Sequence, residues 1–312
     1  MTLGTIHLDR TTHPTRTTEP DVPSLVRKAR QDEALVVGWD ELSDTTQRVI
    51  VRWPRRHSFY TEEGRHRPLL FTESLRQALA LLTHDAHKIP LGHRLGWEHI
   101  RSWVNPASLG GGAESENVTL LITHPVVRRR RMGSVHLTSR IEALREGMHV
   151  GSAEVHYTTH PPVVYDRLRA RYADAQAAFA RALPLTAPVS PAVVGRSDAR
   201  DVVLTPTGTA LEWLLRVDVE HGVLFDHPHD HVPGMVLLEA AAQAAQASVA
   251  HPVEAVEFDT EFYRYVEFDL PCTVAAQPGR PDRNGQVQVQ VTAAQDGRPV
   301  MRATVTTVPR RG

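Results

Sequence analysis

The chain has 312 residues, which is long for one ordinary domain and sufficient for two, so it can bury a sizeable core. Its 35 Lys and Arg residues nearly balance 36 Asp and Glu residues, and 41% of its residues are hydrophobic. This composition is typical of a soluble globular protein and argues against a general affinity for nucleic acid or membranes. The single cysteine, Cys272, excludes an internal disulfide framework, and without a signal peptide or a long apolar span we expect a cytoplasmic protein.

Two segments lack the periodic apolar residues of a folded element. Residues 1–32 are rich in Thr, Pro and charge, which predicts a flexible tail. Residues 182–199, where Pro and small residues cluster after an Arg- and Ala-rich helix at about 163–181, predict a linker. We therefore expect two domains, at residues 33–181 and 200–312.

Both predicted domains show the same order of elements. Each begins with two strands, continues through a loop into one long apolar helix, and ends in several strands with alternating apolar residues. The first strands are expected at 34–42 and 47–53 and at 201–205 and 211–219, and the helices at about 68–84 and 233–249. A helix that is apolar on nearly every face, as MVLLEAAAQAAQASVA is, must be enclosed by protein.

The two halves also align with each other. When Glu73 is placed on Glu239 without a gap, Gln77 falls on Gln243 and Phe59 on Phe225. Apolar positions and the order of elements agree over about 45 residues, which favours an internal duplication over a chance similarity of two apolar helices. One buried helix wrapped by a curved antiparallel sheet is the hotdog fold. The sequence thus predicts an α+β protein with two tandem hotdog folds that form an intramolecular pseudo-dimer.

Several motifs carry a resemblance to known families. The stretch HVPGMVLLEAAAQ is similar to the helix entrance of 3-hydroxyacyl-carrier-protein dehydratases, in which a Pro-Gly turn precedes a carboxylate and a Gln. A closer resemblance extends from about residue 35 to 308. There DHPHDHVPGMVLLEAAAQAA, HRPLLFTESLRQA and SVHLTSRIEALREGMHVGSAEVHYTTHPPVVY resemble the A-factor synthase family of γ-butyrolactone biosynthesis.

This resemblance implies an acyltransferase reaction. A 3-oxoacyl group would pass from its acyl carrier protein thioester to the free hydroxyl of dihydroxyacetone phosphate. The ester would then cyclise to a butenolide phosphate, the precursor of a γ-butyrolactone or furan-type signal that controls secondary metabolism. The acyl carrier protein would be the protein partner, and we expect no cofactor. The acyl-chain length stays open.

Two functions of other classes remain as alternatives. One is a hotdog 3-hydroxyacyl-thioester dehydratase or thioesterase, although the His-Phe-Pro-Gly-His-Pro spacing expected before its helix is absent. The other is a non-catalytic sensor that binds a lactone between the helices. Replacement of each helix carboxylate would separate a sensor from an enzyme.

Acyl transfer needs a base for the attacking hydroxyl and donors for the developing oxyanion. Glu73 and Glu239 each lie on the second turn of an apolar helix, where desolvation is expected to raise the carboxylate pKa. The amide of Gly234, at a helix N-terminus, could donate to the thioester oxygen. Gln77 and Gln243 could position the carboxylates or bind the thioester. A helical Glu that only forms a cap or a salt bridge is the alternative.

The phosphate of the implied substrate requires a cation. Arg76 shares a helix face with Glu73, and family members commonly show E-x-x-R-Q in both halves, but Ala242 replaces the second Arg here. Either the halves have specialised, with Arg76 as the phosphate clamp, or Arg264 reaches the second site from the next strand. Arg101 is the approximate counterpart of Arg264, and a surface role is the alternative for each Arg.

Histidines alternate just before the second helix, at His227, His229 and His231. Three imidazoles on one side of an extended segment could bind zinc, but Pro228 and Asp230 interrupt a regular strand and no clear fourth ligand follows, so we expect no metal. His227 or His231 could instead face the acyl group, as a dehydratase histidine does. A loop whose side chains simply bond the helix entrance is the third possibility.

Four consecutive arginines, RRRR at 128–131, form the longest basic run. They could dock an acidic carrier protein, because such recognition is typically electrostatic. A solvated strand end or turn is the alternative.

Overall fold

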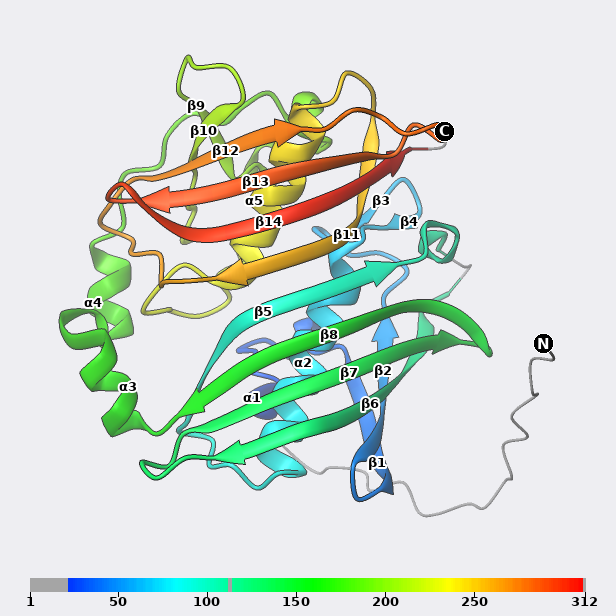
Figure 1. The fold of residues 1–312 in the computed structure, drawn as a ribbon, viewed down its shortest axis with the longest axis vertical. Helices are drawn as coiled ribbons and strands as arrows, with labels where there is room; N and C mark the ends of the chain where they lie inside the picture. Colours follow the sequence, from blue (N-terminus) through cyan, green and yellow to red (C-terminus); the bar gives the residue numbers. More distant parts are fainter. Residues whose placement is uncertain (1–21, 112–113, 311–312) are drawn as a thin grey trace.

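The computed structural model describes residues 22–111 and 114–310. Within these residues, two long helices lie against one side of a large curved antiparallel sheet (Figure 1). No helix in this part of the chain has the length and apolar character needed to span a bilayer. Residues 1–21 of the predicted tail lie outside the described residues.

The sheet has twelve strands and consists of two six-stranded halves joined edge to edge. Its order, β1-β2-β6-β7-β8-β5-β11-β14-β13-β12-β10-β9, runs through the first half and then through the second half in reverse. The first half contains β1 (Val36–Ser43), β2 (Thr46–Trp53), β5 (Arg94–Val104), β6 (Glu116–Arg129), β7 (Val135–Arg145) and β8 (Met148–His160). The second contains β9 (Leu204–Pro206), β10 (Glu212–Leu215), β11 (Val253–Phe262), β12 (Cys272–Pro278), β13 (Val287–Gln295) and β14 (Arg298–Pro309).

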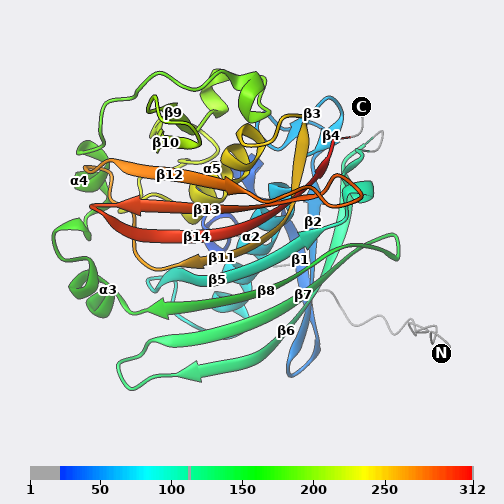
Figure 2. The same cartoon turned by 45° about the horizontal axis from the view of Figure 1, so that its top comes forward.

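The two halves meet where β5 pairs with β11. These strands run antiparallel, from Glu257 opposite Trp103 to Glu261 opposite His99, so backbone hydrogen bonds continue across the junction. Figures 1 and 2 show the resulting continuous sheet, with α2 (Leu69–Asp85) and α5 (Gly234–Ala247) on the same side of it. Each helix is wrapped by its own half-sheet. The prediction of two tandem hotdog units in one chain is confirmed.

Both helices are enclosed because they are apolar on most faces. Leu70, Leu75 and Leu82 of α2 are fully buried, and burial of each such side chain contributes about 1.5–3 kcal/mol. Helix α5 buries four alanines and four larger apolar residues, contacts β12, β13 and β14, and also contacts α2. Their observed ends lie within two residues of the predicted ones.

Alternating residues determine the faces of the sheet. In β13, Val287, Val289 and Val291 are buried on the face that packs against α5, while Gln288 and Gln290 point to solvent. The same alternation predicted the strands of both halves. It was a weaker guide to β9 and β10, which are only three and four residues long.

The remaining elements connect or cover these layers. They are α1 (Val22–Leu25), η1 (Gln31–Glu33), β3 (Thr61–Glu62), β4 (Arg65–His66), η2 (Pro106–Leu109), α3 (Pro162–Arg169), η3 (Ala170–Tyr172), α4 (Ala175–Ala180), η4 (Pro191–Val194) and η5 (Ala199–Asp201). The helical region predicted at 163–181 thus forms as α3, η3 and α4.

The prediction of a flexible tail is wrong for residues 22–32. This segment forms α1 and η1, and it buries Val26 and Lys28. Residues 182–199 connect the two halves, as a linker would, but they also supply η4 and the buried Val194 and Arg196. Both segments precede the first strand of a half, so each covers the corresponding helix.

Candidate active site

Each long helix carries one buried carboxylate. Glu73 on α2 is 2% exposed and Glu239 on α5 is 3% exposed. One turn later, the Nε2 of Gln77 donates to Glu73 Oε1 at 2.8 Å, and the Nε2 of Gln243 donates to Glu239 Oε1 at 2.6 Å. The E-x-x-x-Q spacing therefore builds the same carboxylate-amide pair in both halves.

Each glutamine also fastens its helix to the segment before the first strand. Gln77 accepts from Leu35 N at 2.7 Å, and Gln243 accepts from Val203 N at 3.0 Å. The gap-free alignment placed Leu35 on Asp201, so it is wrong here by two residues. The second half has two residues fewer between this segment and its helix, and its first two strands are shorter.

Two cations hold Glu73. Arg76 Nε and Nη2 donate to its two oxygens at 2.8 Å each, and Lys28 Nζ lies 3.2 Å from Oε1. Burial alone would raise the pKa of Glu73, but Arg76, Lys28 and the Gln77 hydrogen bond outweigh it and hold this pKa well below its usual value. The prediction of a raised pKa is wrong for Glu73, because its charge is compensated inside the protein.

One arginine from a different element holds Glu239. Arg196 Nε donates to Oε1 at 2.9 Å, and its Nη2 lies 2.6 Å from Oε2. In the corrected register, Arg196 is the counterpart of Lys28. The cation missing at Ala242 is thus supplied from the segment before η5.

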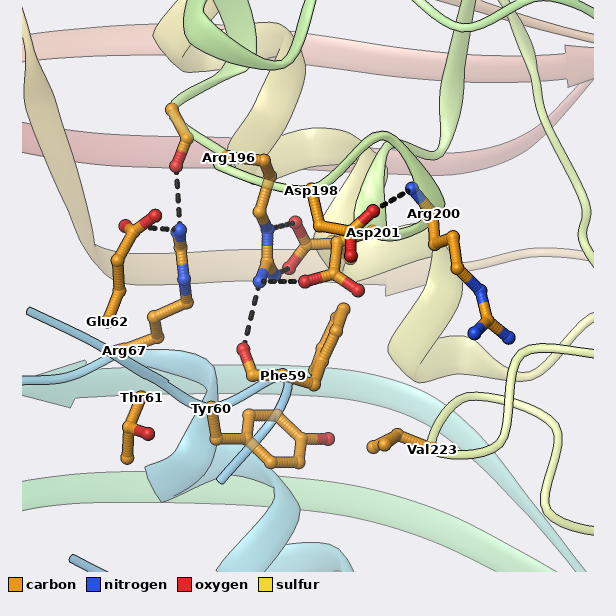
Figure 3. A network of polar contacts seen from close by, with 12 residues as sticks. Phe59, Tyr60, Thr61, Glu62, Arg67, Arg196, Asp198, Arg200, Asp201 and Val223 are labelled. Carbon is orange, nitrogen blue, oxygen red and sulfur yellow. Dashed lines mark hydrogen bonds and ion pairs between the residues drawn. The ribbon is translucent and has the colours of Figure 1, made fainter. Parts of the chain in front are cut away.

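Residues of both halves fix Arg196 in place. Its Nη1 donates to Phe59 O at 2.9 Å, its guanidinium lies 4.1 Å from the centre of the Phe59 ring, and Asp201 Oδ2 lies 3.6 Å away (Figure 3). The loop that contains Phe59 belongs to the first half. The environment of Glu239 is therefore assembled across the boundary between the two units.

Arg264 and Arg101 lie elsewhere. Arg264 is exposed and donates to Pro299 O at 3.1 Å, and Arg101 faces Glu257 across the β5–β11 junction at 3.4 Å. Neither forms a hydrogen bond or ion pair with Glu73 or Glu239 within the described residues, so Arg264 does not supply the second cation.

The histidine loop packs against the first half. Asp226 Oδ2 accepts from Ala29 N at 2.8 Å, and His227 Nδ1 lies 2.7 Å from Asp226 Oδ1. His231 Nδ1 lies 3.0 Å from Asp230 Oδ1, and its ring contacts Tyr265. His227 and His231 are therefore engaged with their own neighbouring carboxylates.

The central histidine of the loop is kept neutral. Burial lowers the pKa of His229 to about 3, helped by the neighbouring imidazoles of His227 and His231. One potential metal-ligand atom each from Asp226, His227 and His229 lies within 4.8 Å of the others. Asp226 Oδ2 accepts from Ala29 N and Oδ1 from His227. That no metal binds to this cluster stays a prediction.

Gly234 begins α5 beneath an aromatic side chain of the first half. A Cβ atom at this position would lie 3.1 Å from Trp97 Cε3 on β5. The glycine thus allows the helix N-terminus to approach the partner half closely. Its role as an oxyanion donor stays a prediction.

A cavity of about 70 Å³ lies beside Glu239, between the two halves. Ala242 and Gln246 line it from α5, and Leu69 and Phe258 add apolar surface. Four arginines also line it: Arg65, Arg67, Arg196 and Arg310. Figure 3 shows Arg67, paired with Glu62, near Arg196. These residues come from segments far apart in the sequence, and the predictions of site residues included none of the four arginines.

Comparison with known proteins identifies relatives over nearly the whole chain. A relative from Streptomyces virginiae is 37% identical over 274 residues, covering 87% of this chain and 92% of its own length. One from Streptomyces griseus is 37% identical over 300 residues, covering 92% and 94%. One from Streptomyces coelicolor is 34% identical over 298 residues, covering 93% and 92%. Each is named 2-oxo-3-(phosphooxy)propyl 3-oxoalkanoate synthase.

Solved structures share the fold at low sequence identity. A candidate thioesterase from Novosphingobium aromaticivorans has a TM-score of 0.52 and 10% identity, covering 88% of this chain and 98% of its own. A candidate oleoyl thioesterase from Lactobacillus plantarum has a TM-score of 0.50 and 13% identity, covering 85% and 97%. The model of the A-factor biosynthesis hotdog domain matches residues 10–161 and 177–310. The chain belongs to the family of A-factor biosynthesis hotdog domain proteins.

Proposed function

We propose that this protein transfers a 3-oxoacyl group from an acyl carrier protein thioester to dihydroxyacetone phosphate. Three relatives that match 87–93% of the chain are named for synthesis of a 2-oxo-3-(phosphooxy)propyl 3-oxoalkanoate. That ester contains a 3-oxoacyl group and the alcohol dihydroxyacetone phosphate. The product would cyclise to the butenolide phosphate precursor of a γ-butyrolactone or furan-type signal.

The transfer step is a nucleophilic acyl substitution. The acceptor hydroxyl oxygen attacks the thioester carbonyl carbon and forms a C–O bond, while its proton passes to a base. The C–S bond then breaks, and the carrier thiolate takes up a proton to become the thiol. The reaction is redox-neutral and needs a base, an oxyanion donor and a site for the acceptor phosphate.

We assign the base to Glu239, and its position in the cavity is the observation that carries the proposal. An ionised carboxylate has about four lone-pair sites. Glu73 has four donors on it, two from Arg76 and one each from Gln77 and Lys28. Glu239 has three, two from Arg196 and one from Gln243. In both carboxylates Oε2 has a single donor, from an arginine, but of the two only Glu239 lines this cavity, where a substrate hydroxyl could reach it.

The carrier protein would dock where β6 ends. Arg128–Arg131 are exposed there, beside the exposed apolar side chains of Val126, Val127 and Met132. A basic surface with apolar neighbours suits an acidic partner, because charge attraction steers the encounter and apolar contact adds to affinity. We call Val126–Met132 the basic strand end.

The proposed reaction is tested with the purified protein, a 3-oxoacyl group loaded on a carrier protein, and dihydroxyacetone phosphate. Mass spectrometry should detect the phosphorylated ester or its butenolide, formed only when all three components are present. Thiol release that is independent of the triose phosphate would instead indicate a thioesterase. Binding of the acyl carrier without any turnover would support a sensor.

A further inference from the structure

Two of the arginines in the cavity beside Ala242, Arg65 and Arg310, make only long side-chain contacts with their partners. Arg65 Nη2 lies 3.3 Å from Pro106 O and 3.4 Å from Glu254 Oε1, and its buried Nε has no hydrogen-bond partner among the described residues. Arg310 reaches Glu62 at 3.4 Å. A buried guanidinium N–H without an acceptor is costly. The cavity therefore lacks a strong hydrogen-bond acceptor at this point.

Arg67 is a further arginine of the cavity wall, and burial affects its pKa. Arg67 donates to Gly195 O at 2.8 Å and pairs with Glu62 at 2.5 Å. Burial, together with the neighbouring Arg196, lowers the pKa of Arg67 to about 10. Four arginines line this partly open space together with Glu62, Glu239 and Glu254. Asp201 and Glu63 also pair with two of these arginines, Arg196 and Arg310. An anion placed there would be stabilised more than in water.

The two arginines on the helix carboxylates are poor alternatives for binding an anion. Arg76 gives two nitrogens to Glu73, and Arg196 gives two to Glu239 and a third to Phe59 O. An anion that captured Arg196 would leave Glu239 buried without a cation, and one that captured Arg76 would leave Glu73 with Lys28 alone, and both outcomes are unfavourable. Arg65, Arg67 and Arg310 pair with glutamates at the cavity wall instead.

We propose that the cavity beside Ala242 binds the phosphate group of the acceptor substrate through Arg65, Arg67 and Arg310. Guanidinium groups match phosphate oxygens with paired N–H donors. The small side chain of Ala242 leaves open the position that an arginine occupies in the first half. This inference rests on the proposed function, because only a phosphorylated acceptor requires such a site next to the base.

The location explains how one molecule could reach both groups. In a triose phosphate, the reacting hydroxyl and the phosphate lie at opposite ends of a three-carbon chain. Glu239 lines the same cavity as the three arginines. A phosphate held by the arginines would therefore direct the hydroxyl toward Glu239. The volume of about 70 Å³ exceeds the roughly 10–15 Å³ needed by one water molecule.

Calorimetric titration of the full chain with dihydroxyacetone phosphate, inorganic phosphate and unphosphorylated dihydroxyacetone tests this site. The two phosphorylated probes should bind and dihydroxyacetone should not. Arg65→Gln and Arg310→Gln should each weaken binding by roughly 10- to 100-fold, the loss expected for hydrogen bonds to a charged group. Arg280→Gln, at an exposed position outside the cavity, should bind like the unmodified protein.

A further variant, Ala242→Leu, tests the cavity without removing any positive charge. Ala242→Leu retains every arginine but fills the cavity, so it should also abolish phosphate binding, with thermal unfolding confirming that the variant is folded. Unchanged binding in Arg65→Gln, Arg310→Gln and folded Ala242→Leu would overturn the site. Loss of phosphate binding in Arg76→Gln alone would also overturn the site, because it would place the bound phosphate in the first half.

The same variants separate this inference from the proposed function. If transfer occurs and the KM for dihydroxyacetone phosphate is unaffected by Arg65→Gln and Arg310→Gln, the function stands and the phosphate site is wrong. If both variants lose phosphate binding but no transfer is found with any carrier-bound substrate, the site stands and the function is wrong.

Discussion

Arg196 and Arg76 compensate equivalent carboxylates from unrelated positions in the chain. Arg76 lies three residues after Glu73 on the same helix, whereas Arg196 approaches Glu239 from the segment before η5. The sequence shows that position 242 lacks an arginine, but it does not show that Arg196 supplies the cation for Glu239 instead. The gap-free alignment does not place Lys28 on Arg196. The two residues align only after the segment before the first strand is shifted by two positions, and the backbone contacts of Gln77 and Gln243 show this shift.

Removing Arg196 should destabilise the fold strongly. Arg196→Met leaves Glu239 buried without its cation, and loss of one partner from a buried ion pair costs about 3–5 kcal/mol. Urea unfolding measures this free energy. Adding Ala242→Arg to the same variant recreates the E-x-x-R-Q arrangement of the first half and should recover part of the loss. A stability change below about 1 kcal/mol in Arg196→Met, the size of a surface pair, would contradict the assigned role.

At the scale of elements, the helices were the most predictable part. Both α2 and α5 are apolar all round, so only an enclosed position fits them, and their ends followed from that pattern. The segment at residues 22–32 was missed because few of its side chains are buried, chiefly Val26 and Lys28, and they form no period. Similarly, η4 and Arg196 lie in a Pro-rich stretch whose composition predicts only a linker.

The basic strand end of β6 should affect only reactions that use the carrier. Arg128→Glu combined with Arg130→Glu should raise the KM for a carrier-bound 3-oxoacyl substrate by roughly 5- to 30-fold, the effect of one to two kcal/mol of exposed charge interactions. The KM for a small soluble 3-oxoacyl thioester should not change. Arg280→Glu combined with Arg283→Glu alters the net charge equally on another exposed loop and should leave both constants unchanged. An equal rise in KM for the carrier-bound and the small thioester would rule out docking of the carrier at this strand.

At the scale of the whole molecule, the reversed strand order makes one chain resemble two copies facing each other. Such an arrangement was predictable from the repeated order of elements. The cavity was not, because it combines a loop of the first half, the connecting segment and the C-terminal Arg310 around α5. Sequence patterns identify residues on one element, whereas this site depends on three segments meeting at the boundary.

The two halves therefore have similar carboxylate sites but different surroundings. Glu73 is held by two cations and does not line this cavity, whereas Glu239 is held by one and lines it. Under the proposed function, this difference gives Glu73 a structural role and makes Glu239 the base. Ala242, at the position that Arg76 has in the first half, is part of the same difference.

The most direct test compares Glu239→Gln with Glu73→Gln in single-turnover transfer to dihydroxyacetone phosphate, with the folded fraction of each variant measured in parallel. Glu239→Gln should lose transfer by roughly 10²- to 10⁴-fold per folded molecule, the contribution of a general base, and it should also lose stability, because the buried Arg196 loses its counter-charge. Glu73→Gln should lose stability, because Arg76 and Lys28 lose their counter-charge, but should keep transfer within about tenfold per folded molecule. Full activity in folded Glu239→Gln, with activity lost in folded Glu73→Gln, would contradict the placement of catalysis in the second half.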